Sequence, residues 1–209
     1  MHAVGLPQDW IINECFGLDD DCLSFVPQPA IAVIAVFESL VKDGSHREVG
    51  DPSLAVDFYM KQTEKLDYAC GVIACIHSVL NNRKVVNLQD GSILHKYFKA
   101  CEGKTAEESA AILENMEEFR TAHISFAAQG QSSQAETGED VKHHFIAFAR
   151  TEGGKLVEFD GMKKGPLVVE EQCEDLLKDT AKVLLKRVEE GLISESIAVQ
   201  VLCKKPDDS

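Results

Sequence analysis

The sequence has few basic residues and lacks a long apolar run near its N-terminus. Its 209 residues include 35 acidic and 21 basic side chains, a formal net charge of −14. Such a chain repels nucleic acids and anionic membranes. A cationic partner suits this charge, although many cytosolic proteins are simply acidic. The longest uninterrupted apolar run near the N-terminus, residues 30–37, is far shorter than the roughly 20 residues of a spanning helix. We expect neither nucleic acid nor membrane as a partner.

The cysteines lack the features of a disulfide framework or a zinc site. Their number is odd, none forms a CxxC pair, and no signal peptide precedes them. No cysteine–histidine cluster has zinc spacing. We therefore expect reduced thiols, no metal and no cofactor in a cytoplasmic protein, with the nucleus as a second compartment. The cysteines are Cys15, Cys22, Cys70, Cys75, Cys101, Cys173 and Cys203.

The length and the apolar pattern predict one α/β domain. A chain of this size buries roughly 70% of its unfolded surface, so we assign residues 1–209 to a single domain with a polar tail at 204–209 and expect a monomer. Residues 30–37, apolar on both faces, predict a central strand covered on both sides. The pattern indicates a central, mostly antiparallel sheet flanked by helices. The other predicted elements are strands at 144–150, 155–160 and 197–203, helices at 71–80, 92–100, 107–119 and 172–190, a short helix from about residue 19, and loops at 42–52 and 126–141.

Cys70 begins an apolar helical run, and this position favours a reactive thiol. The first N–H groups of a helix are unpaired and carry the positive end of its dipole, so the thiolate is stabilised and the pKa of the thiol falls. The alternative is a structural cysteine, because free cysteines are among the most buried residues. Cys75 and His77 lie five and seven residues further along, too far to act on the thiol. We assign both to core packing.

Two predicted strands downstream carry groups that a thiol nucleophile needs. His144 lies at the start of one strand and Asp160 at the end of the next, with a Gly-rich turn between them. Alternation along paired strands lets both side chains face Cys70. The adjacent His143 must point to the opposite face, so at most one of the two histidines belongs to a site. From the residues alone, one buried and one surface histidine is the alternative. Gln62 offers a polar amide just before the helix.

Five short blocks of the sequence follow one another in an informative order. They are Lys61-Gln62-Thr63, Ala69-Cys70-Gly71 with Ile76-His77, Arg120-Thr121-Ala122-His123, His144-Phe145-Ile146-Ala147 and Glu158-Phe159-Asp160-Gly161. Together they resemble the ubiquitin C-terminal hydrolase family of papain-like cysteine proteases, in particular its small single-domain members. The resemblance runs from about residue 5 to residue 203. It implies a papain-like fold with a knotted backbone, and ubiquitin or a ubiquitin-like protein as the partner.

The resemblance also implies roles for four residues. Cys70 would be the nucleophile and His144 the general base and acid. Asp160 would orient His144, and Gln62 would donate a hydrogen bond to the oxyanion. The family threads a crossover loop over its catalytic cleft, here at residues 126–141. The implied reaction is therefore the removal of small adducts or short extensions from the C-terminal glycine of ubiquitin.

Three departures from the family pattern keep other functions open. Gln62 precedes Cys70 by eight residues, whereas the family usually has six. Tyr68 stands where the family often has Asn, and no strand-forming segment precedes residue 6, which is expected to weaken one sheet edge and part of the ubiquitin-contacting surface. The alternatives are a ubiquitin-binding relative with impaired catalysis and another papain-like cysteine acyltransferase.

Overall fold

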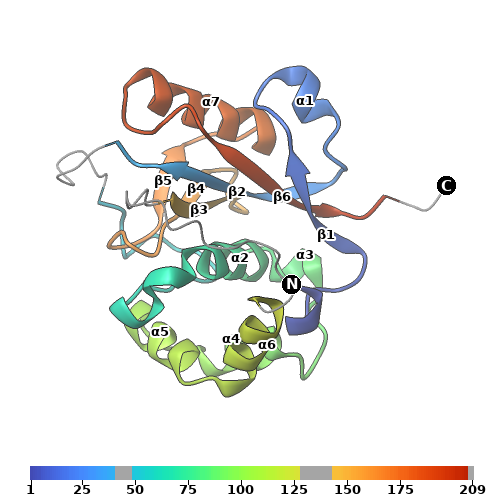
Figure 1. Ribbon diagram of the computed structural model, residues 1–209, viewed down its shortest axis with the longest axis vertical. Coiled ribbons are helices and arrows are strands. Elements are labelled where there is room, and N and C mark those ends of the chain that lie inside the picture. The colour runs from blue at the N-terminus through green and yellow to red at the C-terminus, as the bar shows by residue number, and fades with distance from the viewer. Residues whose placement is uncertain (41–48, 128–142, 207–209) are drawn as a thin grey trace.

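The computed structural model describes residues 1–40, 49–127 and 143–206, and its elements form layers (Figure 1). The strands are β1 (Trp10–Cys15), β2 (Ala30–Glu38), β3 (His143–Arg150), β4 (Leu156–Phe159), β5 (Leu167–Glu170) and β6 (Ala198–Lys204). The α-helices are α1 (Asp20–Ser24), α2 (Cys70–Leu80), α3 (Arg83–Val86), α4 (Ile93–Ala100), α5 (Ala106–Glu114), α6 (Glu117–Ala127) and α7 (Leu176–Glu189). Two 3-10 helices are η1 (His2–Val4) and η2 (Glu64–Ala69).

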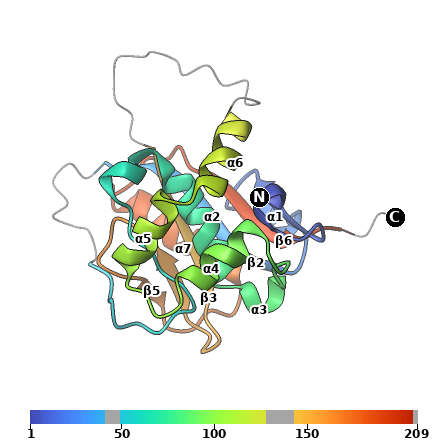
Figure 2. The ribbon, with the colours of Figure 1, turned by 90° about the horizontal axis from the view of Figure 1, so that it is seen from below.

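The strands form one six-stranded sheet in the order β1-β6-β2-β3-β4-β5. Every neighbouring pair is antiparallel. Helices α1 and α7 lie on one side of the sheet, and α2 with the remaining helices lies on the other (Figures 1 and 2). The predicted α/β class, with a central sheet flanked by helices, is confirmed.

Strand β2 lies at the centre of the molecule and is covered on both faces. Ala32 and Ile34 belong to the hydrophobic cluster on the side of α2. Val33 and Ala35 alternate with them and belong to the cluster on the side of α7. All four are at most 2% exposed, which confirms the prediction of a central strand without a polar face.

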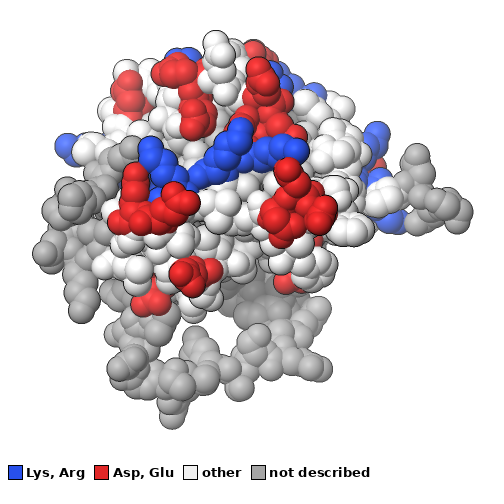
Figure 3. Space-filling view, turned by 90° about the horizontal axis from the view of Figure 1, so that it is seen from above, with Lys and Arg blue, Asp and Glu red and all other residues white. Residues whose placement is uncertain are grey.

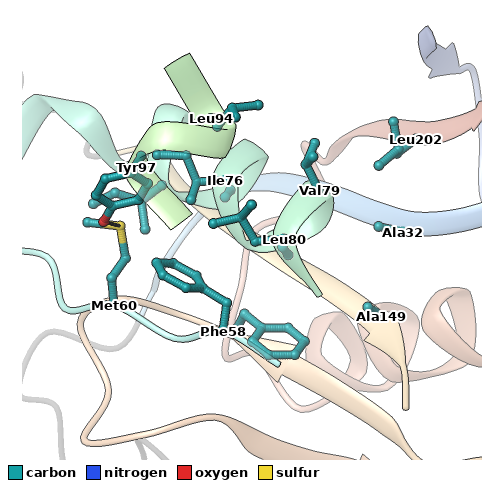
Figure 4. Packing of buried hydrophobic residues seen from close by; sticks show 14 of the residues in the cluster. Ala32, Phe58, Met60, Ile76, Val79, Leu80, Leu94, Tyr97, Ala149 and Leu202 are labelled. Atoms are coloured by element: carbon teal, nitrogen blue, oxygen red, sulfur yellow. Dashed lines mark hydrogen bonds between the residues drawn. The ribbon is translucent and has the colours of Figure 1, made fainter. Parts of the chain in front are cut away.

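Helix α2 lies between the sheet and the outer helices. Its side chains Ile76, Val79 and Leu80 are fully buried. They pack among Leu94 and Tyr97 of α4 and residues of the sheet (Figure 4). Because apolar side chains surround it almost completely, this helix is held by core packing along most of its length.

The structure corrects the prediction of one helix over residues 107–119. Helix α5 ends at Glu114 and α6 begins at Glu117. Asn115 caps α5, and its side-chain amide donates back to Ala111 O at 2.7 Å. This local bond competes with continuation of the helix. A capping box formed by Thr105 and Glu108 begins α5.

The predicted loops at 42–52 and 126–141 lie mostly outside the described residues, and residues 126 and 127 belong to α6. The predicted crossover loop therefore lies almost entirely outside the described part of the chain, and the knotted backbone stays a prediction.

The face formed by α7 and α1 carries both signs of charge. In Figure 3, which looks onto this face, a band of basic side chains lies between groups of acidic ones. Lys178 of α7 pairs with Asp20 at 2.9 Å, and Lys182 pairs with Asp179 at 2.9 Å. Close pairing of this kind leaves no single sign of charge to attract a charged partner here.

Candidate active site

Cys70 occupies the first position of α2, directly after η2. Its side chain is partly buried. Ile73 and Ala74, one turn further on, are at most 2% exposed and belong to the core. The thiol therefore sits at a helix N-terminus whose position is fixed by packing, as the sequence predicted.

The β3–β4 hairpin brings His144 and Asp160 into contact. The last paired residues of this hairpin are Ala147 and Phe159, so Asp160 lies just past the end of β4. His144 Nε2 is 2.9 Å from Asp160 Oδ1, and the two side chains are only 15% and 7% exposed. The neighbouring His143 is exposed. The two histidines thus differ in environment as predicted, and only His144 contacts Asp160.

His144 also interacts with Cys70, because the imidazole lowers the pKa of the thiol and the thiol raises the pKa of the imidazole. Because Nε2 of His144 faces Asp160, the other ring nitrogen, Nδ1, is the one that faces the thiol. The imidazole therefore links the two other groups, through its effect on the pKa of the thiol and through its hydrogen bond to the carboxylate.

Burial and hydrogen bonding have opposite effects on these three groups. Burial opposes ionisation of Cys70, but hydrogen bonds from His144 and the Phe145 backbone lower the pKa of the thiol overall. Burial also opposes the imidazolium, yet the hydrogen bonds and charges of Asp160 and Cys70 raise the pKa of His144 to about 9. Burial is likewise outweighed at Asp160, whose pKa is lowered mainly by His144 and by the N–H of Met162. Both shifts act in favour of a thiolate–imidazolium pair.

Gln62 lies beside the residue that follows Asp160. Its backbone N–H donates to Gly161 O at 2.8 Å. A Cβ on Gly161 would come within 2.9 Å of Gln62 N and 3.4 Å of Ile73 Cγ2, so glycine permits this close approach. Ile73 belongs to the first turn of α2. The structure therefore brings Gln62 to the junction of the Asp160 turn and the helix of Cys70, despite the longer spacing.

The turn after Asp160 is held by residues to which the sequence analysis assigned no role. The Tyr59 hydroxyl lies 2.7 Å from Asp160 O, and the Lys61 ammonium donates to Lys163 O. The Lys163 ammonium in turn pairs at 2.6 Å with Glu158, which is 1% exposed. The sequence signal for this network is a glutamate within the apolar segment 156–159, because a charge that is buried in a strand requires a partner.

His77 and Cys75 belong to the core, as predicted. His77 is fully buried, and its Nε2 accepts the N–H of Met60 at 3.1 Å. Burial lowers the pKa of His77 to about 4 and raises the pKa of Cys75 to about 11. Both are therefore uncharged at neutral pH.

The other cysteines are not placed as reactive groups. Cys22 is partly buried, and the rest are buried, namely Cys15, Cys101, Cys173 and Cys203.

Neither a metal cluster nor a membrane-spanning helix is found in the described ranges. Within residues 1–40, 49–127 and 143–206, no group of three or more His, Cys, Asp or Glu side chains could hold a metal ion. No helix in the same ranges is both long and apolar enough to cross a membrane.

Comparison with known proteins shows one family over most of the chain. The family described as ubiquitin carboxyl-terminal hydrolase, family 1, matches residues 1–189. A probable ubiquitin carboxyl-terminal hydrolase of Dictyostelium discoideum is 32% identical over all of this chain and 84% of the relative. Ubiquitin carboxyl-terminal hydrolase isozyme L1 of Homo sapiens is 30% identical over 98% of this chain and 92% of its own length.

A solved structure shares the fold. The chain resembles the UCH37 catalytic domain of Trichinella spiralis, solved bound to ubiquitin vinyl methyl ester, with a TM-score of 0.73 and 19% identity over 95% of this chain and 87% of the other. At this identity the similarity supports the arrangement of the backbone alone.

Proposed function

Since the chain belongs to ubiquitin carboxyl-terminal hydrolase family 1, a family of cysteine-type deubiquitinases, we propose that it removes small adducts or short extensions from the C-terminal glycine of ubiquitin. The observation that carries this proposal is the His144–Asp160 hydrogen bond, together with the effect of His144 on the pKa of Cys70. Its pKa shifts favour the charged forms that nucleophilic attack needs.

The first half of the reaction forms an acyl-enzyme. The Cys70 thiolate attacks the carbonyl carbon of the terminal glycine, and the C=O π electrons move onto oxygen. As the tetrahedral intermediate collapses, the bond to the leaving nitrogen breaks. The His144 imidazolium donates its Nδ1 proton to that nitrogen, which leaves as an amine. A thioester remains on Cys70.

The second half releases ubiquitin. Neutral His144 takes a proton from water, whose oxygen attacks the thioester, and the Cys70 sulfur leaves as a thiolate. Asp160 holds Nε2 protonated throughout, so Nδ1 is always the nitrogen that exchanges protons with the substrate. In both halves the oxyanion would be stabilised by the Gln62 amide and the Cys70 backbone N–H.

Ubiquitin is proposed as the partner because of the relatives. The named relatives are ubiquitin carboxyl-terminal hydrolases, and the Trichinella spiralis domain was solved with ubiquitin vinyl methyl ester. The restriction to small leaving groups follows from the sequence resemblance, since most of residues 126–141 lie outside the described residues.

The same electrophilic ubiquitin tests the proposal. Incubation with ubiquitin vinyl methyl ester should add one ubiquitin to the wild-type chain, and mass mapping should locate it at Cys70. Cys70→Ala should bind ubiquitin but form no adduct, while Cys75→Ala, on the same helix, should react normally. Binding of ubiquitin by the wild type without an adduct would support the non-catalytic alternative. Neither binding nor adduct would point to another acyltransferase.

A further inference from the structure

The two ends of the turn that carries Asp160 both contact one hydroxyl group, that of Tyr59. Lys163 N–H donates to Asp160 O at 2.9 Å, which closes the turn. The Tyr59 hydroxyl oxygen lies 2.7 Å from Asp160 O and 2.8 Å from Lys163 O. Tyr59 is 101 residues away in sequence from Asp160, so this contact depends entirely on the fold.

A hydroxyl has one proton, so it cannot donate fully to both oxygens. Lys163 O also accepts a hydrogen bond from the Lys61 ammonium, whereas Asp160 O also accepts one from the Lys163 N–H. The tyrosine proton is therefore most useful at Asp160 O. Without the Tyr59 hydroxyl, the carbonyl oxygens of Asp160 and Lys163 would lose this donor and would face the edge of an aromatic ring.

The Tyr59 ring is itself held against the helix of the nucleophile. It stacks on His77 of α2 with ring centroids 5.3 Å apart and planes 4° from parallel. His77 is fully buried and accepts the N–H of Met60, the residue after Tyr59. One tyrosine thus connects the helix that begins at Cys70 with the turn that begins at Asp160.

We propose that Tyr59 is a positioning residue of the hydrolase, whose hydroxyl fixes the Asp160–Lys163 turn so that the Asp160 carboxylate stays aligned with His144. This inference rests on the proposed function, in which Asp160 orients His144. The ring alone would satisfy the stack on His77, and the bonds of Lys61 and Gln62 to the turn would persist without the hydroxyl. The hydroxyl is therefore the group whose removal acts on the turn alone.

Tyr59→Phe makes that change, and the chain offers a matched control. Tyr97 also has a buried hydroxyl that donates to a backbone carbonyl, Ser109 O, at 2.9 Å, but it does not contact the Asp160 turn. Tyr97→Phe therefore reports the general cost of deleting a buried tyrosine hydroxyl. Lys61→Met, which removes the ammonium at Lys163 O while keeping the apolar stem, serves as a second test should Tyr59→Phe fold poorly.

The first measurement is the pKa of His144 by NMR titration of its ring, with the resonance assigned by comparison with His144→Asn. In Tyr59→Phe we expect this pKa to fall by about one pH unit, because a displaced carboxylate stabilises the imidazolium less. The pKa in Tyr97→Phe should equal that of the wild type. This titration needs no turnover, so it tests the link between Tyr59 and His144 even if the proposed reaction is wrong.

The second measurement is hydrolysis of ubiquitin carrying a C-terminal aminocoumarin. Tyr59→Phe should lower kcat on the order of tenfold and leave KM unchanged. A displacement of the Asp160 carboxylate by well under 1 Å should cost less than the roughly 100-fold loss of rate that a displacement of about 1 Å causes. In an Asp160→Ala background the same change should have no further effect on kcat, because the two residues act through one contact.

The outcomes separate the two proposals. An inactive wild type, with the expected NMR shift in Tyr59→Phe, would overturn the proposed function and leave the positioning role in place. An active wild type in which Tyr59→Phe and Lys61→Met match Tyr97→Phe in both the titration and kcat would overturn the positioning role alone. An additive loss in the Asp160→Ala background would also overturn it.

Discussion

Replacing Asp160 with Asn should remove the charge of the triad while keeping the correct tautomer of His144. Asp160 Oδ1 lies 2.9 Å from His144 Nε2 and also accepts the Met162 backbone N–H at 2.9 Å. A backbone N–H only donates, so an Asn at this position is held with its oxygen toward Met162. That same oxygen still accepts from Nε2, and Nδ1 stays turned to the thiol.

The size of the loss follows from what the substitution keeps. An opposite charge at this distance shifts a pKa by about 1–3 units, and the pKa of His144, now about 9, depends on Asp160 and Cys70. Asp160→Asn should therefore lower the pKa of His144 by about 1–2 units and reduce kcat/KM near neutral pH by on the order of 10–100-fold. Asn in a triad that stabilises the wrong tautomer costs about 10,000-fold. Asp160→Ala, which loses both charge and acceptor, should be slower than Asp160→Asn.

The assay is the pH profile of kcat/KM between about pH 5 and pH 10 on a fluorogenic ubiquitin amide. The pKa of His144 is raised and that of Cys70 is lowered, so wild-type activity should rise as the thiolate forms and fall near pH 9, where the imidazolium is lost. In Asp160→Asn the alkaline limb should move to lower pH. A rate for Asp160→Asn as low as that of Asp160→Ala at every pH would show that Met162 does not orient the amide, and the reasoning would fail.

Three other predictions test the surroundings of the site. His144→Ala should abolish turnover while His143→Ala stays near wild type; the reverse result would mean that the wrong histidine has been assigned. Glu158→Gln should destabilise the fold by about 3–5 kcal/mol in urea titrations, because Lys163 at 2.6 Å and Arg187 at 2.5 Å would then face a neutral group; an unchanged midpoint would contradict this buried ion network. The wild-type chain should cleave ubiquitin with a small adduct and leave di-ubiquitin intact; efficient cleavage of di-ubiquitin would refute the proposed size limit.

The sequence predicted well those elements whose own residues have a clear apolar pattern. Residues 30–37 and 71–80 are apolar nearly throughout, and they became β2 and α2 with small changes at their ends. The sequence did not predict β1 as a strand, which pairs with β6 at the opposite end of the chain, nor β5, a four-residue strand at the edge of the sheet. Such strands form because a neighbouring strand is there to pair with them. The local sequence pattern contains no information about that neighbour.

The site shows the same division between local and distant information. Cys70, His144 and Asp160 each stand at the boundary of a predicted element, so the sequence could place all three at one location. Tyr59 could not be found in this way, because its partners are carbonyl oxygens more than 100 residues distant. Backbone acceptors have no sequence signature, so residues that position a catalytic side chain through them are visible only in the fold.

Gln62 is the predicted site residue whose spacing to Cys70 departs from the family pattern, and the fold accounts for this departure. The eight-residue spacing to Cys70 is taken up by η2, in which Leu66 departs from helical geometry with φ −105 and ψ 20. The backbone of Gln62 is meanwhile fixed by its 2.8 Å bond to Gly161 O. We therefore expect Gln62→Ala to lower kcat on the order of 100-fold, as loss of one oxyanion donor does.

A neighbouring substitution provides the control for Gln62. Thr63→Ala removes a hydroxyl that donates to the Glu114 carboxylate, so it perturbs the start of η2 without altering the amide. It should keep kcat near that of the wild type. A near-normal kcat for Gln62→Ala would show that backbone N–H groups alone stabilise the oxyanion. An equal loss in both variants would show instead that the local backbone, and not the amide, had been disturbed.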